Sequence, residues 1–227
     1  MAVASAPAET AQAEAAPRRL KMTYEEYLAW AGEDNILAEW VDGEVIVHMP
    51  PKPLHQRVAV FLTKLLGSFV DLFDLGEVFT AAMEMKLPEG PAREPDVLFV
   101  SKAHAARVID DRLDGPADLA IEIVSDDSVT RDREDKFYEY ERAGIPEYWV
   151  IDPRPNRLRA YFYQLNAQGR YQPVIVGADG VYRSEVLPGF WLKVDWLWAE
   201  QRPDPLLALT EIVGPEKVAE HIKGAAK

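Results

Sequence analysis

Three charged residues of the 227-residue chain lie in stretches that otherwise predict buried or helical structure: Asp96, Glu122 and Lys136. Asp96 follows a Glu-Pro pair at the start of an apolar run, and proline belongs at a strand entrance because it cannot donate to a sheet ladder. Glu122 lies inside the apolar run Leu119–Val124, where a carboxylate is costly unless it is paired, hydrogen-bonded or metal-bound. Lys136 follows on the next predicted helix.

The chemistry that such a set could perform is metal-dependent hydrolysis of a phosphodiester. Two carboxylates on adjacent strands, here Asp96 and Glu122, can hold one or two hard cations through their oxygens. A divalent ion can polarise the phosphodiester and lower the pKa of an attacking water. A lysine near both carboxylates, here Lys136, could orient that water or stabilise the developing negative charge.

Each of the three residues also has an ordinary structural alternative, which the sequence leaves open. Asp96 could simply cap or turn the entrance to its strand, and Glu122 could face water from an edge strand. Residues four apart lie on one side of a helix, so Lys136 shares a face with Asp132 and Tyr140. It could therefore belong to a solvated stripe of ion pairs.

Three helices are predicted to surround these residues. One begins at Thr23, because Glu26 three residues later completes a capping box. A second runs from about His55 to Phe73, where apolar residues recur at helical spacing. A third runs from about Ser128 to Ala143, and Gly144 suits the position just after its end. The last 20 or so residues could form a weak amphipathic helix or fray.

The strands are expected to form a mixed sheet. Asp42-Gly43 between the apolar runs Leu37–Trp40 and Glu44–Met49 is a strong hairpin signal. Trp191–Trp198 should pack on the edge of the domain. Further strands are expected at Val78–Leu87, Asp96–Val100, Leu119–Val124, Glu147–Ile151, Arg157–Gln164 and Tyr171–Val176. Together with the helices, this pattern predicts an α/β (α+β) domain with a mixed central β-sheet flanked by helices.

Composition narrows the class of protein. The chain has no cysteine, which excludes disulfides, thiolate metal sites and a cysteine nucleophile. No apolar run approaches the ~20 residues of a membrane span, and no signal peptide is recognisable, so we expect a cytoplasmic protein without a membrane partner. The net charge of −13 argues against broad adhesion to nucleic acid, because phosphate binding depends on lysine and arginine. The best candidates for phosphate contacts are Arg154, Arg157, Arg159 and Arg170, which could also form an ordinary strand surface.

Several of these pieces, in this order and spacing, resemble the Uma-two family of endonucleases, within the PD-(D/E)XK restriction-endonuclease-like superfamily. The resemblance runs from about Met22 to Tyr163. The matching pieces are Met22–Tyr27, Glu39–Glu44, His55, Glu94–Asp96, Ile121–Ser125, Arg131, Asp132, Lys136, Tyr140, Gly144 and Glu147–Trp149. Each piece alone is weak, and the combination is specific.

The resemblance implies a restriction-endonuclease-like core over residues 21–200, between a flexible N-terminal tail at 1–20 and a C-terminal extension at 201–227. It implies that Asp96 and Glu122 ligate Mg²⁺ or Mn²⁺, that Lys136 assists, and that Glu39 is a further metal or water ligand. Substrate-binding residues implied in the same way are His55, Ser125, Arg131 and Tyr140. Tyr148 and Trp149 are expected in the core rather than as base-stacking groups.

One position departs from the wider superfamily, which places a lysine two residues after the strand carboxylate. This sequence has Val124 there, and the resemblance implies that the lysine has moved to the following helix as Lys136. The leading hypothesis is a Mg²⁺- or Mn²⁺-dependent endonuclease that acts on DNA. A homodimer would suit cleavage of a duplex at two sites, although the sequence does not decide it.

Two other classes of function compete with the nuclease hypothesis. The first is a catalytically inactive binding or scaffold protein that keeps the nuclease fold within a mobile element or defence system. The acidic charge and Val124 favour it. The second is another hydrolase with two carboxylates, such as a glycosidase, which the apolar strands and the helical lysine fit poorly.

Overall fold

The computed structural model describes residues 18–34, 37–48, 50–126, 128 and 131–225. The strands are β1 (Arg18–Lys21), β2 (Ala38–Val41), β3 (Glu44–Val47), β4 (Gly76–Thr80), β5 (Glu84–Lys86), β6 (Ala92–Arg93), β7 (Val97–Ser101), β8 (Arg112–Asp114), β9 (Leu119–Ile123), β10 (Glu147–Asp152), β11 (Arg159–Leu165), β12 (Tyr171–Pro173), β13 (Val181–Arg183) and β14 (Trp191–Lys193). The helices are α1 (Tyr24–Asp34), α2 (Pro53–Phe73), η1 (Lys102–Arg107), η2 (Arg131–Asp135), α3 (Lys136–Ala143), η3 (Val194–Leu197), α4 (Pro205–Val213) and α5 (Pro215–Ala225), where η1 and η3 are 3-10 helices and η2 is one π-helical turn.

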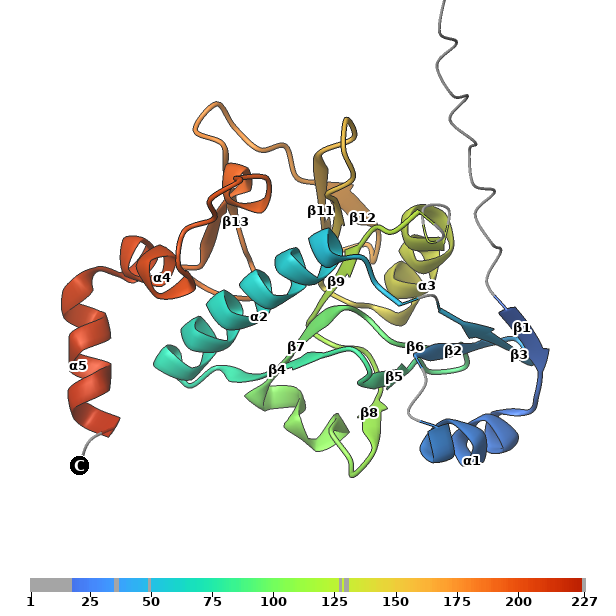
Figure 1. The fold of residues 1–227 in the computed structure, drawn as a ribbon. Coiled ribbons are helices and arrows are strands. Elements are labelled where there is room, and N and C mark those ends of the chain that lie inside the picture. The colour runs from blue at the N-terminus through green and yellow to red at the C-terminus, as the bar shows by residue number, and fades with distance from the viewer. Residues whose placement is uncertain (1–17, 35–36, 49, 127, 129–130, 226–227) are drawn as a thin grey trace, which may run out of the picture.

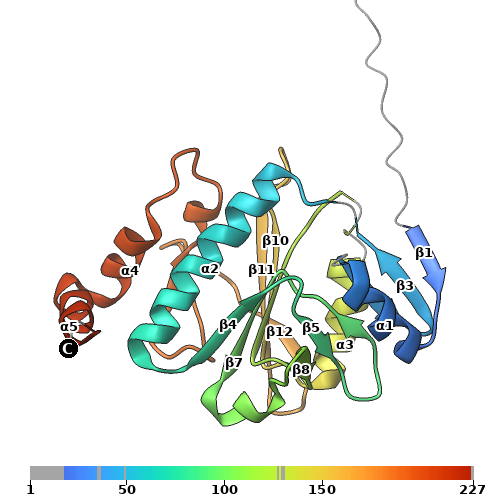
Figure 2. The same cartoon turned by 60° about the horizontal axis from the view of Figure 1, so that its bottom comes forward.

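The six-stranded central sheet has the order β12-β11-β10-β9-β7-β4. β9 and β10 run parallel, whereas the other neighbours are antiparallel, so the predicted mixed sheet is confirmed. Helix α2 lies across one face of this sheet (Figures 1 and 2), and α3 packs on the opposite face. Alternate residues of a strand point to opposite faces, which sorts its side chains between these two helices.

Strand β9 shows this sorting most clearly. Leu119, Ile121 and Ile123 belong to the apolar cluster under α2, together with the buried face of that helix. Ala120 belongs to the second apolar cluster, which includes Tyr140 of α3. Glu122 has the same parity as Ala120, so its carboxylate faces α3 rather than α2.

The N-terminal sheet has the order β1-β3-β2-β6-β5-β8 and lies beside the central sheet, with α1 packed against it (Figure 1). Its β2–β3 hairpin turns at Asp42 and Gly43, both with positive φ, as the Asp-Gly pair predicts. The capping box of α1 also forms, because Thr23 and Glu26 each accept the other's backbone N–H. Met49 lies outside the described residues.

Three predicted elements differ from the structure. Val78–Leu87 is not one strand, since a turn closed by the Met83 N–H and the Thr80 carbonyl sends β4 and β5 into different sheets. The helix predicted from Ser128 becomes α-helical only at Lys136, after the π-helical turn η2, and residues 129–130 lie outside the description. Residues 18–20 of the expected tail belong to β1, which pairs with β3.

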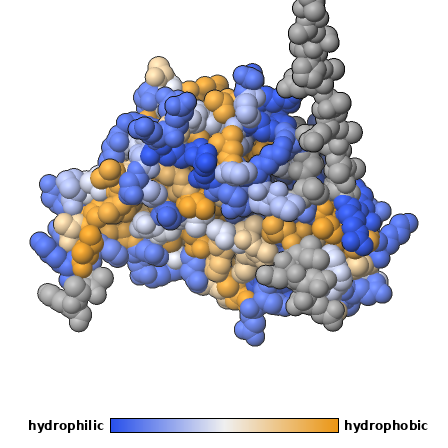
Figure 3. All heavy atoms as spheres, viewed as in Figure 1, coloured by the Kyte–Doolittle hydropathy of each residue, from blue (hydrophilic) through white to orange (hydrophobic). Residues whose placement is uncertain are grey.

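The C-terminal segment completes the cover of α2. β14 contributes Leu192 and η3 contributes Trp196 and Leu197 to the apolar cluster under α2, so the tryptophan-rich segment packs on the domain. Ala208 and Leu209 of α4 join the same cluster. Exposed apolar side chains of α4 and α5 lie at the left of Figure 3. No helix in the described part of the chain is long and apolar enough to cross a membrane.

The packing of α2 predicts the cost of truncating its buried face. Leu65→Ala removes a fully buried side chain and should lower the free energy of unfolding by about 2–5 kcal/mol, because a cavity remains. Val60→Ala on the same helix is the matched control, since Val60 is 47% exposed and its loss should change stability by no more than about 0.5 kcal/mol. Urea denaturation measures both, and equal effects would contradict this packing.

Candidate active site

A buried lysine surrounded by carboxylates lies where α3 meets both sheets. The Lys136 ammonium is 2.8 Å from Glu39 Oε1, 2.9 Å from Glu122 Oε2 and 3.5 Å from Asp132 Oδ1. All four side chains are no more than 3% exposed. We call these four residues the carboxylate–lysine cluster. Burial acts to lower the pKa of Lys136, but the carboxylates of Glu122, Glu39 and Asp132 raise it, so the amine is protonated.

Glu122 is the member of this cluster that the central sheet supplies. The Tyr140 hydroxyl, one turn beyond Lys136 on α3, donates a 2.7 Å hydrogen bond to Glu122 Oε1. Burial raises the pKa of Glu122, and the carboxylates of Asp132 and Asp96 add to the shift against the opposing effect of Lys136. Three carboxylates, those of Glu39, Glu122 and Asp132, thus share the one ammonium of Lys136.

Asp96 lies immediately before β7 and beside Glu122. β7 and β9 are antiparallel with Val97 opposite Ile121, and this register, continued by one residue, brings Asp96 opposite Glu122. The Ile123 N–H donates to Asp96 Oδ2 at 2.6 Å, and His55 Nε2 lies 3.2 Å from Oδ1. The Asp96 side chain is 19% exposed, so it is the more accessible of the two carboxylates.

Glu39 reaches the cluster from β2 of the N-terminal sheet. Besides Lys136, it lies 3.0 Å from Arg93 NH1 and 3.3 Å from His48 Nε2, and it accepts the Glu94 N–H at 3.3 Å. Burial would raise the pKa of this carboxyl, but Lys136, Arg93 and His48 hold it well below its usual range. Glu39 is thus ionised inside a set of donors.

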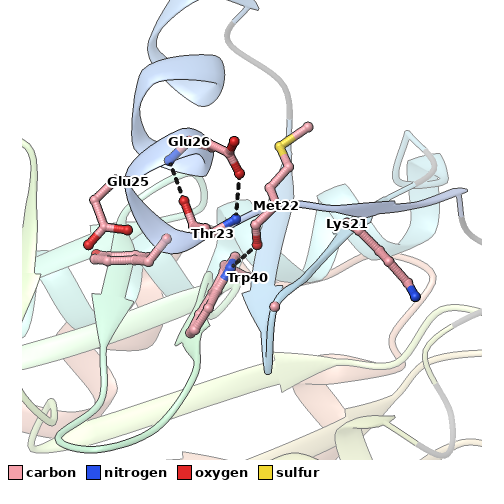
Figure 4. A pocket seen from close by; sticks show the side chains of 8 residues that line it. Lys21, Met22, Thr23, Glu25, Glu26 and Trp40 are labelled. Atoms are coloured by element: carbon pink, nitrogen blue, oxygen red, sulfur yellow. Dashed lines mark hydrogen bonds between the residues drawn. The ribbon is translucent and has the colours of Figure 1, made fainter.

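A shallow hollow of about 670 Å³ lies elsewhere, beside the start of α1 (Figure 4). Met22, Tyr24, Glu25 and Trp40 are among its lining residues, and none of the lining residues belongs to the carboxylate–lysine cluster. The capping box that starts α1 forms part of its wall. The cluster, rather than this hollow, contains the converging charged groups.

Comparison with known proteins shows the family to which the chain belongs. The sequence model described as "Uma2: Putative restriction endonuclease" matches residues 24–195. The chain belongs to the Uma2 family. Among solved structures it is similar to "a putative nuclease belonging to DUF820 from Anabaena variabilis", with a TM-score of 0.64 and 17% identity over 78% of this chain and 97% of that one. No curated protein matches the chain.

The family match confirms the resemblance inferred from the motifs. The structural likeness, at 17% identity, confirms the α/β (α+β) fold with its restriction-endonuclease-like core. It carries no information on the roles of individual residues in this Uma2 protein.

The structure brings together most of the residues that the sequence singles out. Glu122, Lys136, Glu39 and Tyr140 are in contact, and Asp96 lies opposite Glu122 on the neighbouring strand. The remaining predicted site residues lie around them: His55 contacts Asp96, Arg131 lies 3.7 Å from Glu39 Oε2, and Ser125 follows β9, where its N–H donates to Ser128 Oγ. Tyr148 and Trp149 are fully buried, as expected for core residues.

The sequence did not single out Arg93 or His48, which contact Glu39 from β6 and from the residue after β3. No local signal marks them, because they reach Glu39 only through pairing of the N-terminal sheet. The four arginines suggested for phosphate contacts do not form one group. Arg159 and Arg170 lie toward opposite ends of the β11 ladder, and Arg170 pairs with Glu141.

The donor set fits a hard divalent cation held by two carboxylates. Among the described residues, no three His, Asp or Glu side chains converge as a ready metal cage. Mg²⁺ needs no such cage, because it is commonly held by one or two carboxylates and completes its shell with water and substrate phosphate. Asp96 and Glu122 supply such a pair on adjacent strands, and a cation between them would offset the repulsion of the two carboxylates, which adds to the effect of burial on the pKa of Glu122.

Glu94, next to this site, should make stability depend on pH. Burial, with the charges of Glu39 and Glu84, raises its pKa from 4.5 to about 8. Between these values the folded protein keeps a proton that the unfolded chain releases, so stability falls as pH rises, by up to about 1.4 kcal/mol per pH unit. Glu94→Gln mimics the neutral form and should remove this contribution to the slope.

Urea denaturation at several pH values from about 5 to 9 measures this slope, because that range covers most of the interval between the unfolded and folded pKa values of Glu94. Glu77→Gln on β4 is the control, because Glu77 is exposed and its substitution should leave the slope unchanged. A slope as steep in Glu94→Gln as in the unsubstituted protein would show that Glu94 is ionised in the folded state.

Proposed function

We propose that this protein is a Mg²⁺- or Mn²⁺-dependent endonuclease that hydrolyses phosphodiester bonds of DNA. The observation that carries the proposal is the contact of the Lys136 ammonium with Glu122, at 2.9 Å from Oε2, together with the position of Asp96 opposite Glu122 on the neighbouring strand. Membership of a family described as restriction endonucleases, and the likeness to a chain described as a nuclease, support a nuclease rather than another hydrolase.

In this proposal Asp96 and Glu122 would hold the cation. A bound divalent ion would polarise the phosphodiester and lower the pKa of a bound water. The Ile123 N–H and His55 fix the Asp96 carboxylate, and the Tyr140 hydroxyl fixes Oε1 of Glu122. Such neighbours orient metal-binding carboxylates before any ligand arrives.

Lys136 contributes a fixed positive charge in this proposal. Its amine stays protonated because three carboxylates surround it, so it would stabilise negative charge that develops on the phosphate rather than remove a proton from water. Arg131, whose side chain is 10% exposed, lies next to the carboxylate–lysine cluster, where it contacts Glu39 and His48. It remains our candidate for a substrate contact, together with His55.

A second candidate function is binding without catalysis on the same fold. The observation that favours it is the pairing of Lys136 and Arg93 with carboxylates, which leaves these two cations turned toward the protein rather than toward a substrate. Calorimetric titration with Mn²⁺ separates the two functions. The weakest cation sites of proteins have a Kd of about 1 mM, so absence of Mn²⁺ binding at millimolar concentration would support a protein that binds without catalysis.

Two further expectations from the sequence remain proposals. A homodimer would bring two such sites to one duplex, and sedimentation analysis tests it. The division into a tail at 1–20, a domain at 21–200 and an extension at 201–227 would be tested by limited proteolysis. In the structure, β1 begins at Arg18, and α4 packs on α2, which favours extending the folded domain at both ends.

The central prediction concerns Asp96. Asp96→Asn should lower the rate of DNA nicking in Mg²⁺ or Mn²⁺ by about 100-fold or more, since a bound metal supplies several kcal/mol of transition-state stabilisation. It should also weaken Mn²⁺ binding in calorimetry. Nicking of supercoiled plasmid DNA gives the rate.

Asp118→Asn is a closely matched control. Asp118 lies immediately before β9, accepts the Ser101 N–H at 2.7 Å and lies 2.8 Å from His104 Nδ1. It therefore has the same kinds of contact as Asp96, at the opposite end of the β7–β9 pair. Equal nicking by Asp96→Asn and the unsubstituted protein, or equal losses in both variants, would rule out the assigned role of Asp96.

A further inference from the structure

Glu39 has both carboxylate oxygens occupied by the protein's own cations and donors. Oε1 lies 2.8 Å from Lys136 Nζ and accepts the Glu94 N–H at 3.3 Å. Oε2 lies 3.0 Å from Arg93 NH1 and 3.3 Å from His48 Nε2. The side chain is 1% exposed, whereas that of Asp96 is 19% exposed. Two of these contacts are with fixed cations, Lys136 and Arg93, whereas the similarly buried Glu122 has Lys136 as its cationic partner, so the protein itself offsets the charge of Glu39 more fully.

Glu39 is part of a chain of ion pairs that runs from Glu139 through Arg93 and Glu39 to Lys136. Glu139 of α3 accepts two hydrogen bonds from Arg93, at 2.8 Å from Nε and 2.7 Å from NH2. Arg93 donates through its remaining terminal nitrogen to Glu39, and Glu39 contacts the Lys136 ammonium. Bidentate pairs of this kind fix direction as well as distance.

Lys136 needs such a restraint because a lysine side chain is long and its ammonium is a point charge with rotatable donors. Without Glu39, the amine would keep one close contact, with Glu122 at 2.9 Å, and a longer one of 3.5 Å with Asp132 of the same helical segment. Glu39 and Glu122 come from different sheets, and their oxygens lie 2.8 and 2.9 Å from the same nitrogen. Two such contacts from separate elements define one position for the amine.

We propose that Glu39 is a positioning residue that holds the Lys136 ammonium against Glu122, and that it does not ligate the metal. This inference rests on the proposed function and assigns the N-terminal sheet a part in the reaction. It replaces the metal-ligand role that the family resemblance implied for Glu39. The loss of Glu39 should then slow turnover while metal and DNA still bind.

The kinetic test compares Glu39→Gln, which removes the charge, with Glu39→Asp, which keeps the charge and withdraws it by one methylene. Glu39→Gln should lower kcat for DNA nicking by up to about 100-fold, and Glu39→Asp by about 10-fold, because small displacements of a reacting group have effects of this size. KM for DNA and the Kd for Mn²⁺ should stay within about twofold of the unsubstituted protein. Glu39→Asp retains the buried ion pair, so it tests the inference if Glu39→Gln fails to fold.

The matched control is Glu84→Gln. Glu84 is another buried carboxyl of the N-terminal sheet, hydrogen-bonded to Tyr24 at 2.5 Å, and it contacts no member of the carboxylate–lysine cluster. Its substitution should leave kcat unchanged. A Kd for Mn²⁺ raised about tenfold or more by either Glu39 variant would make Glu39 a metal ligand, and an unchanged kcat in folded Glu39→Asp would equally overturn the inference.

A readout without catalysis separates this inference from the proposed function. In protein labelled with ¹⁵N-lysine, the Lys136 ammonium should give a slowly exchanging resonance, because the group is buried and paired. This signal should shift or vanish in both Glu39 variants and persist in Glu84→Gln. If the signal responds so while the unsubstituted protein cleaves no DNA, the nuclease proposal fails and the positioning role of Glu39 stands. An unaltered signal in both Glu39 variants would remove the positioning role.

Discussion

The Lys136 ammonium is a charge removed from water, and its burial constrains the surrounding structure. Taking an ion out of water costs several kcal/mol, which is offset only when opposite charges lie close with good geometry. The acceptors are Glu39 of β2, Glu122 of β9 and Asp132 of η2. These elements belong to two sheets and a helical turn, so all three must meet at one point. The docking of the N-terminal sheet against α3 and the formation of the site are therefore one event.

The net charge of −13 bears on how this protein would attract a nucleic acid. The nearby cations Lys136 and Arg93 are almost fully buried, and each lies against carboxylates instead of facing outward. A phosphate backbone approaching the site would meet little unpaired positive charge from these side chains. Attraction for a polyanion in the proposed reaction would then depend on the bound metal, and binding would be sensitive to its concentration.

Local rules were enough to find the residues of the central sheet. A lone carboxylate in an apolar strand marked Glu122, a proline before an apolar run marked Asp96, and helical spacing found α2 and α3. Arg93 was not predicted, because its contact with Glu39 depends on the pairing of β2 with β6, two strands that lie far apart in the sequence. The single strand predicted over 78–87 failed for a similar reason, since its apolar residues serve two sheets.

The π-helical turn η2 sets which side chain of the following helix reaches the interior. A π turn encloses one more residue than an α turn, and each residue in a helix rotates the next by about 100°. The Tyr148 hydroxyl fixes the turn by donating to the Asp132 carbonyl at 2.6 Å. Without the extra residue, α3 would present a neighbour of Lys136 to Glu122. The side chain that reaches Glu122 thus depends on how α3 is rotated about its axis. A chain shortened by one residue in η2 would need a different sequence to rebuild the same interior.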